Sequence, residues 1–430
     1  MSKPCHYRTS RGLKPFVFGP ALLLIAFAFG PGCSKSPSDD SDTHADLRHR
    51  ASEGENQAKI ELGNKYFYGD GVDKDISTAK DWYSRAARHE DPSAQWRMGR
   101  IYRGDGGNEP DPEEANRWFR KAAEQGQAEA QLALALWFYT KRHESNEKAL
   151  QSYKWIFRAA EQGLTCAQFL LASSYYLGIG TEIDYEASYR WAHKAADGGS
   201  DVAQNLLGLI YRDARGTDQD DPKAVHHFRQ AAEAGNSHAQ QNLGYMFTKG
   251  RGVEKDYEEA RRWFSKAAAQ GYDEAQYYLG WLYHKGRGGE TDFKAAYRWY
   301  RKAAEQGHDA ASVNLALLYH NGEGVTEDKR KALSWMTKAA QSGCPDAQNR
   351  LALFHSQGIS YRKNYPKAYR WAKKSSEQEF PEGKLTLGVM YYHGLGVEAD
   401  KETGLRLIRR AAFAGVPDAQ KVLWNLGEEL

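Results

Sequence analysis

The sequence predicts an all-α protein, an α/α superhelical solenoid of ten helix-turn-helix repeats of 36 residues. Three observations lead to this prediction. Trp recurs at a regular interval, Ala and Gly are plentiful, and one pattern of small and aromatic residues returns along most of the chain. Because Trp is an uncommon residue, its regular spacing is a reason to test first for internal repeats. A chain of 430 residues would otherwise be expected to form two or three globular domains.

The repeat is defined by a small residue that returns every 36 positions, with one extra residue in the third copy. These first positions are Ala58, Ala94, Ala130, Ala167, Ala203, Ala239, Ala275, Ala311, Ala347, Gly383 and Ala419. We therefore expect ten repeats over residues 58–418, a capping helix over 419–430, and a tether with a degenerate cap helix over 34–57. Terminal units that close a solenoid are generally atypical.

The first half of each repeat has the spacing of an amphipathic helix. In the sixth copy Ala239, Leu243 and Phe247 fall on one face. Position six is Gly or Ala in all ten copies. A Gly inside a helix costs about 1 kcal/mol relative to Ala, so this pattern indicates the close approach of a second helix. Gly250 and Gly252 then supply the positive φ angles that end the helix and turn the chain.

The second half of each repeat predicts a helix that begins at an N-cap and buries small residues and one Trp. Asp256 and its equivalents have the oxygen that accepts a hydrogen bond from a free backbone N–H. Ala260, Trp263 and Ala267 share one face. We expect the tryptophans to fill the core between hairpins. Eight copies have Trp at this position: Trp82, Trp118, Trp155, Trp191, Trp263, Trp299, Trp335 and Trp371.

These motifs resemble the Sel-one-like repeat, a subclass of the tetratricopeptide-like solenoids. The matching pattern is Ala-x-x-x-Leu-Gly-x-x-Tyr-x-x-Gly-x-Gly-Val, an Asp cap, and Lys-Ala-x-x-Trp-Tyr-x-Lys-Ala-Ala-x-x-Gly. The resemblance implies a right-handed superhelix whose first helices line a concave groove, and members that act as adaptors in multiprotein assemblies. Several bacterial members are envelope proteins tied to polysaccharide export, signalling or host contact. One branch, described as a β-lactamase, has a Cys pair in each repeat that is absent here, so that activity is not expected.

Three copies depart from the pattern, and we expect them to be locally looser or kinked. The third lacks both turn glycines over residues 139–146, and the fifth has His227 in the position of Trp. The ninth has Ser360 in place of the second turn Gly, and Ser375 and Ser376 in place of an Ala pair.

Residues 1–33 predict a signal peptide of the lipoprotein type. A positively charged start precedes an apolar stretch over residues 16–29, which is too short to span a membrane. The small-residue run that ends at Cys33 is similar to a lipobox, although Gly30 stands where Leu is usual. Lipidation of Cys33 would imply the periplasmic side of the outer membrane. The alternative is cleavage after residues 26–28, which would give a soluble periplasmic or secreted protein.

The sequence indicates no enzyme, cofactor or metal site. GxSxG, HExxH, phosphate-loop and Cys-x-x-Cys motifs are absent. The adjacent His226 and His227 would point about 100° apart on a helix, which argues against chelation. A net charge of +3 with mixed signs does not suggest a nucleic-acid partner. Cys166 and Cys344 lie too many repeats apart to form a disulfide bond.

The variable positions of the first helices are the candidate partner-binding surface. They are Trp96, Arg100, Phe169, Tyr176, Tyr245, Tyr277, Trp281, His284, Lys285, His320, Tyr392 and His393. Aromatic and Arg side chains dominate the energetics of protein interfaces, so we expect a non-enzymatic scaffold of the cell envelope that binds a protein or peptide. An alternative is a glycan-binding or polysaccharide-export accessory protein that uses Tyr277 and Trp281 as stacking platforms. Some of these residues could instead pack between neighbouring first helices.

Overall fold

The computed structural model describes residues 44–359 and 362–429, which form twenty-two helices and no strand. These residues divide into two compact units, 44–236 and 237–429. None of the helices combines the length and the apolar character needed to cross a bilayer. The predicted signal segment and Cys33 lie outside the described residues.

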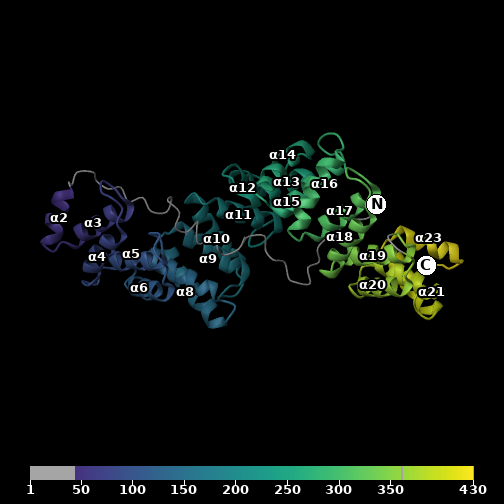
Figure 1. Ribbon diagram of the computed structural model, residues 1–430, viewed down its shortest axis with the longest axis horizontal. Coiled ribbons are helices and arrows are strands. Elements are labelled where there is room, and N and C mark those ends of the chain that lie inside the picture. Colours follow the sequence, from purple (N-terminus) through teal and green to yellow (C-terminus); the bar gives the residue numbers. More distant parts are fainter. Residues whose placement is uncertain (1–43, 360–361, 430) are drawn as a thin grey trace. The chain divides into compact units, whose positions relative to one another are not determined.

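Each unit consists of five helical hairpins and one extra helix (Figure 1). The first unit contains α2 (His44–Ser52), α3 (Asn56–Tyr68), α4 (Ile76–Ala87), α5 (Pro92–Arg103), α6 (Pro112–Glu124), α7 (Ala128–Thr140), α8 (Asn146–Glu161), α9 (Thr165–Leu177), α10 (Tyr185–Asp197), α11 (Asp201–Asp213) and α12 (Asp221–Glu233). The second unit contains α13 (Ser237–Lys249), α14 (Tyr257–Ala269), α15 (Asp273–His284), α16 (Phe293–Glu305), α17 (Asp309–Asn321), α18 (Lys329–Gln341), α19 (Pro345–Gln357), α20 (Tyr365–Glu377), α21 (Pro381–His393), α22 (Lys401–Phe413) and α23 (Pro417–Leu426).

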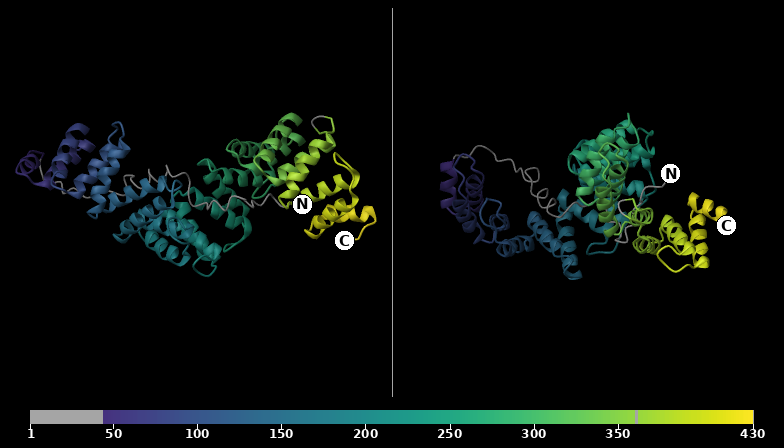
Figure 2. Two further views of the ribbon diagram at one scale, coloured as in Figure 1. Left: turned by 90° about the horizontal axis from the view of Figure 1, so that it is seen from below. Right: turned by 45° about the vertical axis from the view of Figure 1, so that its right-hand side comes forward.

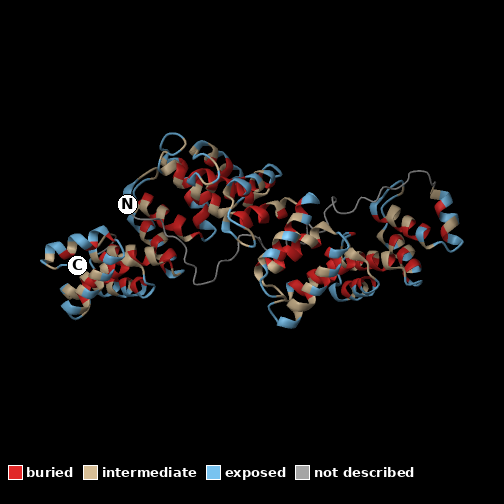
Figure 3. Ribbon diagram, turned by 180° about the vertical axis from the view of Figure 1, so that it is seen from behind, coloured by how far each residue is buried: buried red, intermediate tan, exposed pale blue. Residues whose placement is uncertain are grey.

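From α3 onwards the odd-numbered helix is the first helix of a repeat and the even-numbered helix is the second. Within a unit, each first helix packs against the second helix of its own hairpin and against the second helix of the preceding one. The hairpins of each unit therefore stack in order of sequence (Figure 2). Buried residues follow the sides on which helices meet, and exposed residues gather in the turns (Figure 3). The predicted all-α solenoid is confirmed.

The small residue at position six of each repeat is matched in size to one residue of the second helix. A Cβ atom added to Gly208 would lie 2.5 Å from two ring carbons of Phe228, twenty residues later. Five of the six described glycines at this position face an aromatic ring: Tyr83, Phe119, Phe228, Phe264 or Tyr300. Where the position is Ala, the corresponding residue of the second helix is Ile156, Ala192, Met336 or Ala372. The predicted close approach of the two helices is confirmed, and its reason is the volume of the opposing side chain.

The predicted N-caps are also present. Asp256 accepts hydrogen bonds from the backbone N–H groups of Glu258 and Glu259, at 2.8 and 3.0 Å. In the irregular third repeat, Ser145 caps α8, which has 16 residues where α10 has 13. The helices of this repeat are continuous, so the inserted residue lengthens the second helix rather than breaking it.

The second glycine of the turn forms the joint between successive repeats. An added Cβ atom would fall 2.2 Å from the carbonyl oxygen of Phe293 at Gly324, and 2.3 Å from that of Tyr257 at Gly288. Equivalent approaches of 2.2 to 2.4 Å occur at Gly180, Gly216 and Gly396. In each case the carbonyl belongs to the start of the preceding repeat's second helix, so the turn packs against the neighbouring hairpin.

Paired glutamine side chains, one buried and one exposed, join the two helices of a hairpin and connect it to the preceding one. The amide of Gln306 donates to the side-chain oxygen of Gln276 at 2.9 Å, and Gln276 donates to the carbonyl oxygen of Ala268 in the preceding repeat. The same side-chain pair recurs between Gln125 and Gln95, Gln162 and Gln131, Gln270 and Gln240, and Gln378 and Gln348. These amides satisfy the polar groups that the stacked helix ends would otherwise bury.

The tryptophan that recurs in the second helices is less buried than predicted. Only Trp155 and Trp263 are buried, at 8% and 7% exposed, and the other six tryptophans are half-buried. In all eight copies the Lys or Arg three residues later lies over the indole ring, at 4.1 to 4.8 Å from the ring centre. The expectation that all eight are core residues is therefore corrected. The second helix exposes the outer face of the indole ring toward solvent, and the cation covers that face.

In the fifth repeat His227 fills the tryptophan position. Its ring stacks on Tyr211, with centres 5.5 Å apart and an interplanar angle of 4°, and Nδ1 donates to Gln204 Oε1 at 2.7 Å. His193 of the preceding hairpin lies beside it, 6.0 Å away between ring centres. Burial, with the neighbouring His226, His193 and Lys223, lowers the pKa of His227 to about 4.

We expect this histidine to make the first unit less stable in acid. Because its pKa is lower in the folded state, the unfolded chain binds more protons between the ordinary histidine pKa and about pH 4. Stability is thus fully present at neutral pH and falls as the pH decreases through this window. In urea unfolding, His227→Trp should show a smaller loss of midpoint from pH 7 to pH 5 than the wild type. The exposed His89, changed to Gln, serves as the control; an equal loss in all three proteins would contradict the prediction.

Two departures from the pattern, one in the ninth repeat and one at the first position of the tenth, compensate for each other. Ser375, which replaces a core Ala, is fully buried and donates from Oγ to the carbonyl oxygen of Pro345 at 2.8 Å. A Cβ atom added to Gly383 would lie 2.3 Å from this Oγ. Gly383 is the only first position of the repeats that is not Ala. The larger Ser is therefore accommodated by the smaller Gly across the joint. Ser360 lies outside the described residues.

Candidate partner-binding surface

The twelve candidate residues of the first helices differ widely in burial. Four are buried: Trp96, Phe169, Tyr176 and Tyr277. Six are half-buried: Arg100, Tyr245, Trp281, His284, His320 and Tyr392. Lys285 and His393 are exposed. The variable positions thus serve two purposes, packing and surface.

The four buried rings pack between hairpins and offer little surface to a partner. Tyr277 is 7% exposed, and its ring lies parallel to that of His308 at 4.7 Å between centres. His308 in turn joins Glu274 through Nε2 at 3.0 Å and accepts the N–H of Ala311 at Nδ1. This arrangement occupies a face of Tyr277, which is therefore a poor stacking platform for a sugar ring.

In the first unit, Arg100 is the half-buried candidate, and its guanidinium group is already engaged. It donates to Asp105 at 2.9 Å and to the hydroxyl of Tyr68 at 2.8 Å, and lies over Phe67 and Trp96. Although burial alone would raise the pKa of Asp105, the hydrogen bonds and charges of Arg103 and Arg100 hold it below its usual value. The ion pair fixes the turn of the second repeat, so Arg100 has a structural role here.

In the second unit, Tyr245 on α13 and Trp281 on α15 are half-buried aromatic side chains, and each has a cation over its ring. Lys249 lies over the ring of Tyr245 at 5.5 Å. Arg287 lies over the ring of Trp281 at 4.8 Å and donates to the hydroxyl of Tyr257. Arg287 was missed by the sequence analysis. It stands between two turn glycines in the seventh repeat, as Arg251 does in the sixth, and this repetition was the available signal.

Position seven of the repeat, which Tyr245 and Trp281 occupy, holds a half-buried side chain in every repeat of the second unit. The half-buried side chains on α13, α15, α17, α19 and α21, here called the first-helix row, are Tyr245, Trp281, Leu317, Leu353 and Val389. The helices α19 and α21 contact each other directly, which places Leu353 and Val389 on adjacent helices. The aliphatic members were missed because only aromatic and charged residues were chosen as candidates.

The two candidate histidines contact different groups. His284 lies 3.8 Å from Glu323 and 3.5 Å from the hydroxyl of Tyr300. Burial and the charge of Lys285 lower the pKa of His284, against the opposing effect of Glu323. His320 packs against Phe354, 5.3 Å away between ring centres. In the described part of the chain, no three His, Cys, Asp or Glu side chains gather as a metal site would require.

The sequence of each hairpin matches one repeat of a known family. The model of the Sel1 repeat matches ten times, over residues 56–91, 92–127, 128–164, 167–200, 201–236, 237–272, 273–308, 309–344, 345–380 and 383–415. The chain belongs to the Sel1-repeat family. Sel1-repeat proteins are generally protein-interaction scaffolds, and the match indicates no catalytic family.

Solved Sel1-repeat structures are similar over most of the chain. A protein of uropathogenic Escherichia coli, c5321, is described as a protective antigen with this fold. It is 32% identical, with a TM-score of 0.75, over 90% of this chain and 84% of its own. A Sel1-repeat protein of Oxalobacter formigenes is 32% identical, with a TM-score of 0.54, over 72% of this chain and 89% of its own. Among curated proteins, none matches the sequence.

Proposed function

We propose that the chain is a non-enzymatic scaffold of the bacterial cell envelope that binds a protein partner on the first-helix row of the second unit. The observation that carries this proposal is the row itself. Five half-buried side chains follow one another at one position of five successive repeats. Trp281 and Tyr245 lie at one end of the row with cations over their rings. A large apolar centre bordered by polar groups is the anatomy of protein interfaces.

The envelope location is part of the proposal. It is supported by the signal-like segment of residues 1–33 with Cys33 at its end, which would give a lipid anchor on the periplasmic side of the outer membrane. The related E. coli protein is described as a protective antigen, which agrees with such a location. Incorporation of labelled palmitate into the wild type but not into Cys33→Ser would support lipidation. A mature amino terminus downstream of residues 26–28 would instead indicate a soluble exported protein.

The scaffold function is tested by crosslinking and capture from envelope extract. Trp281→Ala removes the largest side chain of the row, and we expect it to weaken capture of the partner by about tenfold, as is typical of a buried interface Trp. Trp424→Ala is the matched control, because Trp424 on α23 is 84% exposed and lies outside the row. Equal capture by both variants would refute the row as the binding surface. Turnover of a small substrate that Trp281→Ala abolishes would refute the non-enzymatic assignment.

The alternative of glycan binding is examined with the same variants. The rings of Tyr277 and Trp281 are covered by His308 and Arg287, which weakens the case for sugar stacking. Binding of the cell's own envelope polysaccharide that depends on Trp281 would nevertheless establish it in place of the protein scaffold.

A further inference from the structure

Charge is distributed unevenly between the two units. The five second helices of the first unit (α4, α6, α8, α10 and α12) carry twelve Lys or Arg and ten Asp or Glu residues. The five second helices of the second unit (α14, α16, α18, α20 and α22) carry nineteen Lys or Arg and five Asp or Glu residues. Four of these helices, α16, α18, α20 and α22, hold sixteen of the basic residues and only three acidic ones. The small net charge of the whole chain conceals this local excess.

The basic residues occupy outward positions of their helices. On α16 the buried side is formed by Ala296, Tyr300 and Ala303, and Arg298, Arg301 and Lys302 lie on the exposed side. The ninth and tenth repeats have cations at the same three positions: Arg370, Lys373 and Lys374, and Arg406, Arg409 and Arg410. The eighth repeat has Lys329, Arg330, Lys331 and Lys338, all exposed. We call these thirteen side chains, together with Lys294 of α16, Lys367 of α20 and Lys401 of α22, the basic stripe.

Direct contacts show that consecutive members of the stripe lie beside one another. Lys338 of α18 donates to the carbonyl oxygen of Ala304 on α16 at 3.4 Å. Gln378, the residue after α20, donates to the carbonyl oxygen of Gly343, which follows the end of α18 in the sequence, at 3.0 Å. Arg410 of α22 forms an ion pair at 3.2 Å with Glu379, which follows the end of α20 in the sequence. The positive charge therefore extends across four neighbouring repeats of one unit.

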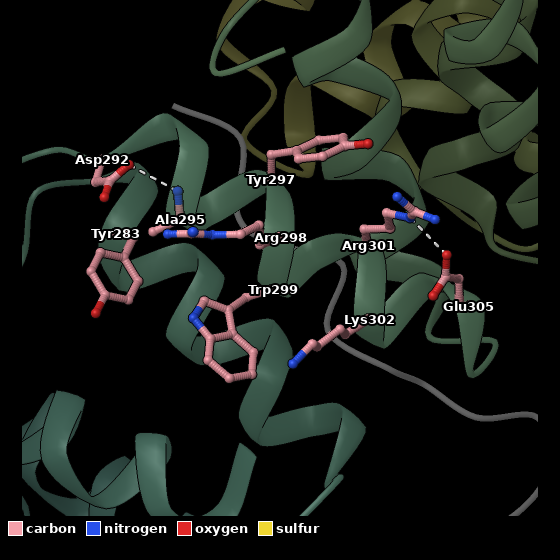
Figure 4. Close-up of a pocket in the computed structure, with 9 residues that line it drawn as sticks. All are labelled: Tyr283, Asp292, Ala295, Tyr297, Arg298, Trp299, Arg301, Lys302 and Glu305. Carbon is pink, nitrogen blue, oxygen red and sulfur yellow. Dashed lines mark hydrogen bonds and ion pairs between the residues drawn. The ribbon is translucent and has the colours of Figure 1, made fainter. Parts of the chain in front are cut away.

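The stripe includes an open hollow of about 600 Å³ at α16 (Figure 4). Tyr283 and Trp299 provide aromatic walls, and Arg298, Arg301 and Lys302 provide cations. Among the described residues that line the hollow, the acidic ones are Asp292, which caps α16, and Glu305, which pairs with Arg301 at 2.7 Å. Such a hollow can accept an apolar side chain while the cations around it bind carboxylates.

The aromatic rings of the stripe do not offer free faces for stacking. Lys302, Lys338 and Lys374 lie over Trp299, Trp335 and Trp371 at 4.6 to 4.8 Å. Recognition of single-stranded nucleic acid or of sugars depends on bases or rings that stack on exposed aromatic faces. The covered indoles therefore favour a partner that is recognised by its charges and by an apolar side chain.

We propose that the basic stripe binds an acidic, extended protein segment that places one apolar side chain in the hollow at Trp299. This inference deepens the proposed scaffold function and rests on it, since it adds a second surface and the chemistry of its ligand. Each repeat adds roughly the width of one packed helix, about 10 Å, so the second helices of four successive repeats extend over about 30 to 40 Å. An extended peptide of about 12 residues covers the same distance.

The proposal is tested with the full chain and a fluorescent Glu-rich peptide of about 12 residues with one central Leu, a length set by the span of the stripe. The variant Arg298→Glu/Arg301→Glu/Lys302→Glu is expected to weaken binding by about tenfold or more. The variant Arg370→Glu/Lys373→Glu/Lys374→Glu should also weaken binding of the peptide, and it replaces the first variant in the test if that variant is unstable. Added salt should weaken binding to the wild type, because the cations are exposed.

A matched control exists on α6 of the first unit. Arg117, Arg120 and Lys121 are exposed, occupy the same three positions, and are accompanied by three Glu residues on that helix. Reversing these charges alters the net charge equally, and we expect binding to change less than about twofold. An equal loss in both variants would overturn the proposal, because only net charge would then matter.

Other polyanions test whether the basic stripe binds a different class of ligand. Heparin, duplex DNA and vesicles of phosphatidylglycerol are titrated with the same variants. Stripe-dependent binding that is tighter than that of the peptide would assign the surface to a polysaccharide, a nucleic acid or a membrane and overturn the proposal. If no probe binds while Trp281 remains necessary for partner capture, the inference about the stripe fails and the proposed scaffold function stands.

Discussion

Replacing Gly324 by Ala is expected to lower the free energy of unfolding of the second unit by about 3 to 4 kcal/mol. Gly324 has a φ of +69°, and an added Cβ atom would lie 2.2 Å from the carbonyl oxygen of Phe293. An L-residue pays roughly 1 to 2 kcal/mol for the left-handed conformation. The clash adds a further cost, because the contact is with the backbone of the preceding hairpin, which cannot move aside as a side chain can.

The control is Gly307→Ala in the same unit. Gly307 has a φ of +93°, but an added Cβ atom would meet nothing within 4 Å. This variant should therefore show only the conformational cost of about 1 to 2 kcal/mol. Urea unfolding followed by circular dichroism compares the two, and hydrogen exchange locates the loss, because repeat units need not unfold in one step. Equal destabilisation would show that the turn does not form the joint between repeats.

Gly208→Ala is expected to destabilise the first unit, and a smaller residue at position 228 should restore much of the loss. The new methyl group would lie 2.5 Å from the ring of Phe228, which is fully buried. Overpacking of this kind costs about 1 to 3 kcal/mol, partly offset by the gain of about 1 kcal/mol in helix propensity. In the double variant with Phe228→Met, the added methyl group has room, as at Ala316 and Met336 in the eighth repeat.

A double-mutant cycle measures this reciprocity. The two single changes should each destabilise, and the double change should cost less than their sum by about 1 to 2 kcal/mol. Gly244→Ala is the graded control, because its added Cβ atom would lie 3.1 Å rather than 2.5 Å from the opposing ring of Phe264. A smaller loss of stability in Gly244→Ala than in Gly208→Ala would confirm that the distance between the added methyl group and the opposing ring decides the cost in stability. Additive single changes would contradict the pairing of position six with the second helix.

Much of the fold could be predicted because each repeat is specified by local chemistry. Helix ends follow from residues such as Asp256 and Gly250, whose capping and turning depend only on near neighbours. The irregular copies were harder to interpret. His227 and Ser375 looked like sites of looseness, yet the structure provides each with a partner from elsewhere in its unit, at Tyr211 and at Gly383.

The candidate site was predicted only in part. The twelve variable residues of the first helices were the candidate surface, but Tyr277 is buried while Trp281 is half-buried. Burial at these positions depends on the neighbouring hairpin, and periodicity within one helix cannot report it. The basic stripe was missed for a related reason. Its residues are visible in the sequence, but their common direction required the outward side of each second helix to be known.

The regular positions of the 36-residue repeat were determined by the sequence alone, because small residues, caps and turn glycines act on the chain next to them. The ten Sel1 repeats, their helix boundaries and the close helix contact at position six follow from that chemistry. Tertiary structure alone decided which variable side chains pack and which remain at the surface. It also decided that the tryptophans lie beneath cations at the edge of the core, since burial is set by hairpins that meet only after the chain has folded.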